Sequence, residues 1–140
     1  MSGAATMLAV MAGAASVAQE APERVTPMDQ RVAVVSVLDK VSGDTADYEV
    51  RPGDRIKFRA LNIRLVACET TPPWAQMPQT GAFVQVDKRR NGGGVARIFS
   101  GWLFAESPSL NSVDDPNYDV WVKSCAMSFP ESGPDTILVN

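Results

Sequence analysis

Apolar and polar residues alternate with a period of two along much of the chain, between residues 31 and 125. Residues 55–59 show this most clearly, because their odd positions are cationic and their even positions are apolar. Successive side chains of a β-strand point to opposite faces, so each such run predicts a half-buried strand. Residues 47–51, 55–59 and 81–87 are predicted as strands in this way. Residues 31–38 are predicted as a strand from a short apolar run rich in β-branched residues, and further strands are predicted at residues 62–70, 95–105 and 118–125.

Turn residues separate these runs. Pro52-Gly53-Asp54 predicts a tight turn, and residues 88–94 predict a charged, glycine-rich hairpin connection. Residues 71–79 contain three prolines and predict a surface loop that carries Trp74. Gly101 predicts a β-bulge or a close approach within its strand.

No run of useful length shows a helical period, so the sequence predicts an all-β fold. We expect a small sandwich or open barrel of about seven mostly antiparallel strands, with a meander from residue 31 to residue 70.

The first 18 residues are apolar, short and rich in Ala and Gly, and they end in Ser16-Val17-Ala18. This pattern predicts a secretory signal peptide that is cut after Ala18, although no Lys or Arg precedes the apolar run. The alternative is a retained membrane anchor. Either interpretation places the folded part outside the cytoplasm, and we expect a periplasmic protein.

The rest of the chain divides into three parts. Residues 19–30 predict a linker, and residues 31–126 predict a single β-domain. Residues 127–140 predict a tail, in which residues 137–139 either add an edge strand or stay loose.

The composition of the chain argues against several classes of function. The chain has 140 residues, a net charge of −3 and no histidine, which removes the commonest general base and metal ligand. A general nucleic-acid-binding protein is usually basic, so nucleic acid is not an expected partner. We expect no catalytic residues, no metal and no cofactor. Cys68 and Cys125 are far apart and predict one structural disulfide in an oxidising compartment; two buried free thiols are the alternative.

Two groups of charged residues suggest chemistry. Asp114, Asp115 and Asp119 could serve a hydrolase or bind Ca²⁺, but acids in such a turn more often cap backbone groups. Arg55, Lys57 and Arg59 should point the same way from one strand, close in sequence to Arg51 and Arg64. These cations either protect an edge strand from aggregation or dock an acidic protein surface or anionic lipid headgroups. A further run lies in the hairpin connection: Lys88, Arg89 and Arg90 are either solvated or bind an anionic partner.

Aromatic residues gather in two predicted strands that we expect to be neighbours: Phe99, Trp102, Phe104, Tyr118 and Trp121. Core packing is their first explanation. The long strand, residues 95–105, is apolar on both faces, so a partner must cover one face if the domain has a single sheet layer there. Trp74, between prolines, is either an exposed interface anchor or a side chain folded back on the domain.

Residues 37–43, 99–111 and 115–125 together resemble a family of secreted alphaproteobacterial proteins, domain-of-unknown-function family 2155. The Phe-Ser-Gly-Trp-x-Phe-Ala and Tyr-Asp-Val-Trp cores carry the resemblance, which covers about residues 31–125. It implies a periplasmic location, a Cys68–Cys125 disulfide and no assigned catalytic activity. It also implies an association with respiratory complex I, because genes of this family tend to lie near one for an accessory subunit of that complex.

We therefore expect a non-catalytic periplasmic protein-interaction domain, an accessory or stabilising component of an inner-membrane assembly, with respiratory complex I as the candidate. Its partner-binding residues would be Trp74, Arg55, Lys57 and Arg59, with contact to the membrane surface as a further expectation. One alternative is a free-standing envelope protein that binds a small or polymeric ligand. The other is a carboxylate-dependent hydrolase.

Overall fold

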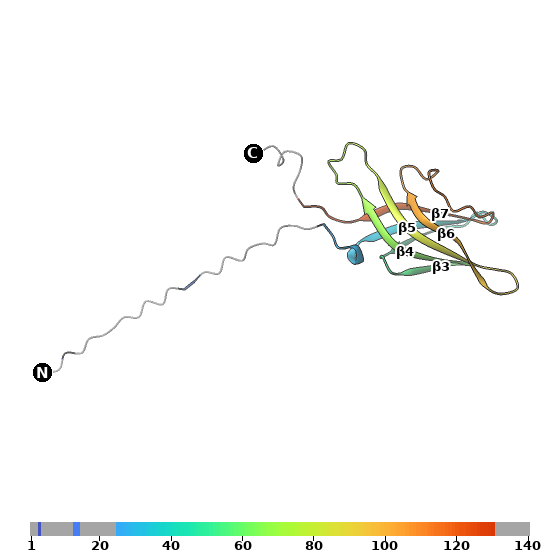
Figure 1. Cartoon of the computed structure of the whole chain (residues 1–140), viewed down its shortest axis with the longest axis horizontal. Coiled ribbons are helices and arrows are strands. Elements are labelled where there is room, and N and C mark those ends of the chain that lie inside the picture. Colours follow the sequence, from blue (N-terminus) through green and yellow to red (C-terminus); the bar gives the residue numbers. More distant parts are fainter. Residues whose placement is uncertain (1–2, 4–12, 15–24, 131–140) are drawn as a thin grey trace.

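We analysed a computed structural model of the chain, which describes residues 25–130 together with Gly3, Gly13 and Ala14 (Figure 1). The predicted signal peptide, its cleavage site after Ala18, most of the predicted linker and the predicted edge strand at residues 137–139 lie outside the described residues. Within the described residues no helix has the length and apolar character needed to cross a bilayer.

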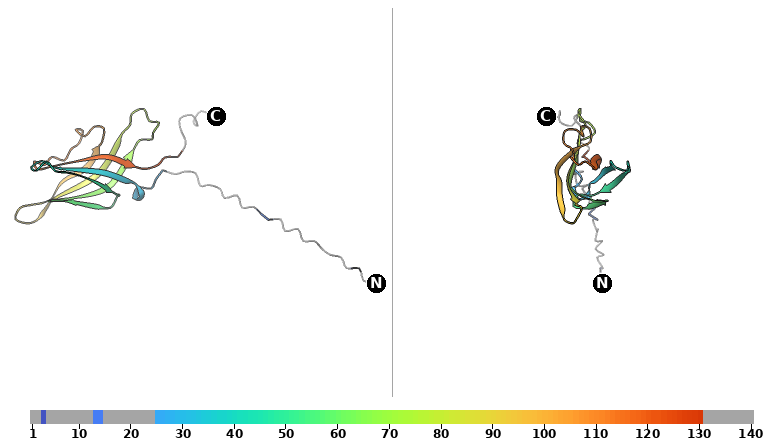
Figure 2. Two further views of the ribbon diagram at one scale, coloured as in Figure 1. Left: turned by 180° about the vertical axis from the view of Figure 1, so that it is seen from behind. Right: turned by 90° about the vertical axis from the view of Figure 1, so that its right-hand side faces the viewer.

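The described chain folds into seven strands and one short 3₁₀ helix, Met28–Gln30. The prediction of an all-β fold is confirmed, and the two sheets pack face to face as a sandwich (Figure 2, right). The strand order is β2-β1-β7 in the smaller sheet and β3-β4-β5-β6 in the larger, and all pairs are antiparallel. The strands are β1 Val32–Asp39, β2 Thr45–Val50, β3 Arg55–Phe58, β4 Leu61–Thr70, β5 Thr80–Arg89, β6 Val95–Phe104 and β7 Tyr118–Ala126.

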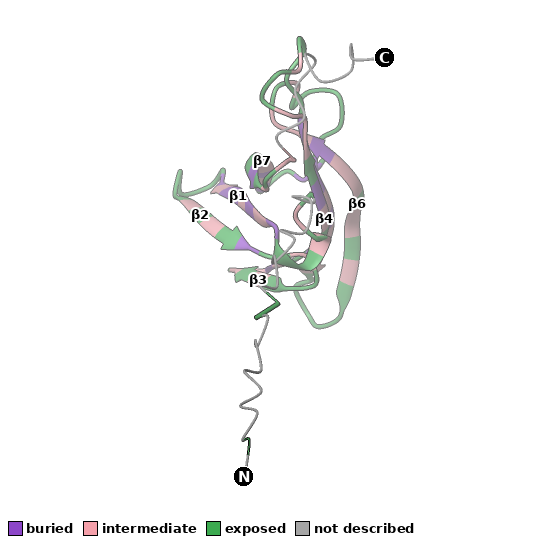
Figure 3. Cartoon of the chain, turned by 90° about the vertical axis from the view of Figure 1, so that its left-hand side faces the viewer, coloured by how far each residue is buried: buried purple, intermediate pink, exposed green. Residues whose placement is uncertain are grey.

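The core follows from the alternation along the strands. Alternate side chains of β1 and β5 are fully buried, among them Val35, Val37, Val84 and Val86. β4 contributes Leu61, Ile63 and Leu65 in the same way. Figure 3 shows buried stretches, in purple, on strands of both layers. Burial of such side chains, each worth about 1.5–3 kcal/mol, is what holds the two layers together.

The predicted meander from residue 31 to residue 70 is wrong at its centre. β1 pairs with β2, and β3 pairs with β4, but β2 and β3 belong to different sheets. The predicted turn at Pro52-Gly53-Asp54 is present, and Gly53 adopts a φ of 97° there. A tight turn is compatible with a hairpin or with a change of sheet, so the turn residues alone did not decide between them.

The aromatic strands are not neighbours as expected, because β6 and β7 lie in different sheets. They face each other across the sandwich instead. Gly101 of β6 is a close-approach site rather than a bulge: a Cβ there would lie 3.0 Å from the side-chain nitrogen of Asn111. The register shift of β6 falls earlier, between residues paired with Val86 and Asp87, where Ile98 is the extra residue.

The disulfide between Cys68 and Cys125 joins β4 to β7 and therefore joins the two sheets, as predicted. Both cysteines are buried. Arg31, also buried, reinforces this end of the sandwich: its guanidinium donates to the carbonyl of Cys68 at 2.7 Å and pairs with Glu69 at 2.8 Å. The sequence analysis placed Arg31 only as the first residue of a strand.

The domain extends slightly beyond the predicted boundaries. The end of the predicted linker and the start of the predicted tail lie side by side, since the backbone N–H of Ser128 donates to the hydroxyl of Thr26 at 2.8 Å. Met127 packs against the core. Residues 25–30 and 127–130 are therefore part of the folded body.

Candidate interaction surface

The outer face of the larger sheet carries the predicted cations in ordered rows across the strands. Directly paired residues share a face, so one row contains Lys57, Asn62, Asp87 and Arg97. The next row contains Arg55, Arg64, Gln85 and Ser100, and Arg89 and Val95 form a third row at the end of the sheet. These residues form what we call the cationic rows: Arg55, Lys57, Arg64, Arg89 and Arg97, with Asp87 as their carboxylate.

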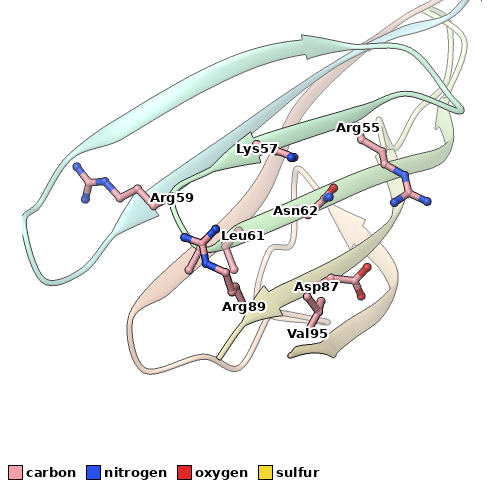
Figure 4. A pocket seen from close by; sticks show the side chains of 9 residues that line it. Arg55, Lys57, Arg59, Leu61, Asn62, Asp87, Arg89 and Val95 are labelled. Atoms are coloured by element: carbon pink, nitrogen blue, oxygen red, sulfur yellow. The ribbon is translucent and has the colours of Figure 1, made fainter. Parts of the chain in front are cut away.

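Most of these cations have no ion-pair partner. Within the described part of the chain, no carboxylate lies within 4.0 Å of Arg55, Lys57, Arg64 or Arg89, although six other cations are paired. Arg55 lies directly opposite Arg64, and a like-charge pair in that position destabilises a sheet. Three cations of the rows, Arg55, Lys57 and Arg89, line a surface cavity of about 320 Å³ together with Asp87 (Figure 4). This face therefore carries uncompensated positive charge in a hollow.

Asp87 is the internal counter-charge of the cavity. Its carboxylate accepts a bond of 2.9 Å from Arg97 on the neighbouring strand. The hydrogen bond from Arg97, together with the charges of Arg97 and Arg55, lowers the pKa of Asp87 despite some burial. Asp87 thus stays ionised and neutralises Arg97, which leaves the other four cations uncompensated.

Arg59 borders the cavity, but contrary to prediction its charged group does not point the same way as Arg55 and Lys57. Its guanidinium points away from Arg55 and Lys57 (Figure 4) and pairs with Asp39 and with Asp44, the latter at 2.6 Å. The cause is the turn between β3 and β4, where Arg59 has a φ of 53° and the strand alternation ends. Hydrogen bonds from Arg59 and Ser42 lower the pKa of Asp44. At Asp39 burial opposes ionisation, but the hydrogen bond and charge of Arg59 and the backbone N–H groups of Val41 and Ser42 together outweigh it and lower the pKa.

The other end of the same outer face is aromatic. Phe83 lies opposite Trp102, and their rings meet edge to face at 5.7 Å between centroids. Gly81 lies opposite Phe104, and a Cβ at Gly81 would lie 3.1 Å from a ring carbon of Trp102. Glycine therefore lets the indole lie flat over β5. Trp102 and Phe104 line a largely apolar groove of about 440 Å³, together with Pro72 and Phe129. We call this the aromatic groove.

Trp74 combines the two predicted alternatives. Its side chain is 42 % exposed, yet its ring meets that of Phe129 edge to face at 6.2 Å. Through this contact the proline-rich loop packs against the segment that follows β7. Phe129 of that segment also lines the aromatic groove. Trp74 borders the groove through Phe129 and also faces solvent.

The three acids of the 114–119 segment are not gathered in one site. Asp115 is buried and accepts from Lys88 at 2.9 Å and from the backbone N–H groups of Asn117 and Tyr118. Burial opposes ionisation of Asp115, but these bonds outweigh it and its pKa is lowered. Asp119 pairs with Lys40 at 3.2 Å, and Asp114 is exposed. Asp115 thus acts as the turn cap that the sequence offered as the alternative to chemistry.

Two other observations concern ligands. Within residues 25–130 no group of three or more His, Cys, Asp or Glu side chains is placed to hold a metal ion. Trp121 lines a second surface cavity, of about 410 Å³, with Val113 and Asp119. This cavity and the aromatic groove are where the ligand-binding alternative would have to place its ligand.

Residues 33–125 match the family model DUF2155, described as an uncharacterized protein conserved in bacteria. The chain belongs to the DUF2155 family. The match covers β1 to β7 up to Cys125 and thus includes both the cationic rows and the aromatic groove. No curated protein and no solved structure matches the chain.

The alternation along the strands identified only part of the candidate interaction surface of this DUF2155 domain. It identified Arg55 and Lys57 but missed Arg97 and Asp87, which join them only through the register of β4, β5 and β6. It also missed the pairing of Gly81 with the strand that carries Trp102. A glycine within the alternating run of residues 81–87 was the one sequence signal for that close approach.

Proposed function

We propose that this DUF2155 domain is a non-catalytic periplasmic interaction domain that binds a protein partner through the outer face of its larger sheet. The observation that carries the proposal is the set of uncompensated cations in the cationic rows, in a chain whose other cations are mostly paired. Positive charge without an internal partner favours an external acidic one.

The disulfide supports the periplasmic part of the proposal, because such bonds persist in oxidising compartments. The role we propose is that of an accessory or stabilising component of an inner-membrane assembly. Respiratory complex I is the specific candidate, on the basis of the family's gene neighbourhood. A periplasmic location predicts that osmotic shock releases the folded domain or that it stays on the outer side of spheroplasts, where added protease reaches it.

The test of the assembly is affinity purification of the full chain from membranes solubilised in a mild detergent, followed by mass spectrometry. We expect the protein to elute with a large membrane complex and to enrich subunits of respiratory complex I. Elution alone at the mass of the monomer, under detergent conditions that keep complex I intact, would contradict the proposal. Enrichment of a different inner-membrane complex would keep the accessory role and overturn the named partner.

A further inference from the structure

The cationic rows and the aromatic groove lie on one continuous face. Along β5 the row of Asp87 and the row of Gly81 are six residues apart, so the two features are separated by about 20 Å at about 3.3 Å per residue. Residues that line each hollow lie on the outer side of the sheet, among them Lys57 and Asp87 at one end and Trp102 and Phe104 at the other. The face therefore offers a charged end and an apolar end at a fixed distance.

From this arrangement we infer that the face binds one extended, acidic segment of a partner protein, with an aromatic side chain at one end. Carboxylates of the segment occupy the cavity that Arg55, Lys57 and Arg89 line at the row of Asp87. Arg64 does not line this cavity but lies directly opposite Arg55 at its border. The aromatic side chain enters the groove between Trp102, Phe104 and Pro72. This inference deepens the proposed function and rests on it for the identity of the partner.

The shape of the face favours a protein segment over a lipid surface. Membrane-binding faces present apolar side chains that project into the bilayer, whereas Trp102, Phe104 and Phe129 are half-buried and line a hollow. Asp87 adds a carboxylate inside the cationic cavity, where it would repel a dense layer of anionic headgroups. A peptide carboxylate can instead bind selectively beside Arg55 and Arg64, on the row that lacks an acid.

An extended conformation follows from the spacing. A segment that spans about 20 Å needs about six residues as a strand but about thirteen as a helix. The rows also repeat at the two-residue spacing of a strand, so alternate side chains of an extended segment can reach successive rows. The expected ligand is thus a cluster of Asp or Glu about six residues from a Phe, Tyr or Trp.

The test uses the purified full-length protein and fluorescently labelled synthetic peptides, with binding followed by fluorescence anisotropy. The probe carries about four acidic residues, a spacer of about six residues and one Trp, made in both chain directions. We expect at least one direction to bind. Two matched peptides check each end: one has Asn and Gln in place of the acids, and one has Ala in place of Trp. Both should bind at least about 10-fold more weakly.

Protein variants locate the site. Arg55→Glu with Arg64→Glu should weaken peptide binding by about 10-fold or more and reduce its dependence on salt. Lys123→Glu is the matched control, since it reverses a charge of the same sign on the opposite sheet and should change affinity less than about twofold. Phe104→Ala should weaken the Trp-containing peptide and leave the Ala-containing peptide unchanged. Circular dichroism verifies that each variant is folded.

Unchanged peptide affinity in the Arg55→Glu, Arg64→Glu variant would overturn the inference. So would binding to vesicles that contain anionic phosphatidylglycerol in the absence of binding to any acidic peptide. The result is independent of the purification described above. If the peptide binds as expected but no membrane complex is recovered, the proposed assembly fails and the surface stands. If the complex is recovered equally with the charge-reversed variant, the assembly stands and this surface is wrong.

Discussion

The two ends of the sandwich join the same two sheets by different chemistry. At the end where β1 begins, the Cys68–Cys125 bond connects β4 to β7, and the buried Arg31 connects the start of β1 to β4, so both links join the two sheets. At the end where β1 finishes, ion pairs do so: Arg59 reaches Asp39, and Lys88 reaches Asp115. One end therefore contains a link that is sensitive to reduction, whereas the other is joined by carboxylate pairs that depend on pH. A third group of cations, Arg55, Lys57, Arg64 and Arg89 of the cationic rows, has no ion-pair partner within the described chain.

The largest effect should come from the covalent end. Replacing both Cys68 and Cys125 by Ala removes a cross-link that spans 57 residues, and the chain-entropy model gives a loss of about 4 kcal/mol in the free energy of unfolding. Urea denaturation measures it, and reduction of the native protein should lower the midpoint similarly. A variant with an unchanged midpoint would mean that the disulfide adds nothing to the stability that the buried core and the ion pairs already provide.

At the ion-paired end, Asp115 should matter most. Asp115→Ala removes the partner of Lys88 and the acceptor of two backbone N–H groups, all in a mostly buried setting, and should cost about 2 kcal/mol. Asp114→Ala is the control, because that neighbouring acid is exposed and should have little effect. Equal losses in urea denaturation of the two variants would show that Asp115 is not the cap of this turn.

The Arg59 pairs predict a pH dependence. The pKa values of Asp39 and Asp44 are lowered in the folded protein, so their contribution is present above the unfolded value of about 3.9 and is lost as pH falls through the folded values. Arg59→Ala should lower the urea midpoint at neutral pH and flatten its decline below about pH 4. The curves of variant and native protein should converge in acid.

Lys57→Ala is the control for that experiment, since Lys57 has no ion pair within the described chain and should leave the acid decline unchanged. A native protein that showed no steeper acid decline than the Arg59→Ala variant would contradict the assigned pairs.

Local alternation was enough to predict the strands, because burial on one face imposes a period of two whichever strand lies alongside. It failed where the backbone leaves the strand geometry. Arg59 follows the four alternating residues of β3 but lies in a turn with positive φ, so its side chain points to the other sheet. The sequence also did not predict that the chain changes sheet after β2. A tight turn at Pro52-Gly53 is compatible both with a hairpin and with a change of sheet.

The candidate surface needed information that no single strand carries. Lys57, Asp87 and Arg97 are brought into one row by the registers of three strand pairs, each of which includes or follows a bulge or turn. A slip of one residue in any pair would move these charges to the core face. The disulfide was predictable because only two cysteines exist in the chain, so pairing them required no register.

A substitution in the cationic rows should cause the smallest change in stability. Unlike replacement of the paired cations, it should raise the free energy of unfolding. Arg64→Glu replaces a like-charge pair with Arg55 by an opposite-charge pair, so it should raise the free energy of unfolding by about 0.5 kcal/mol. The same substitution should weaken binding of the acidic peptide. A side chain whose replacement improves the fold and impairs binding is retained for the partner rather than for the structure. Loss of stability in urea denaturation of Arg64→Glu would instead place Arg64 with the structural cations of Arg59 and Lys88.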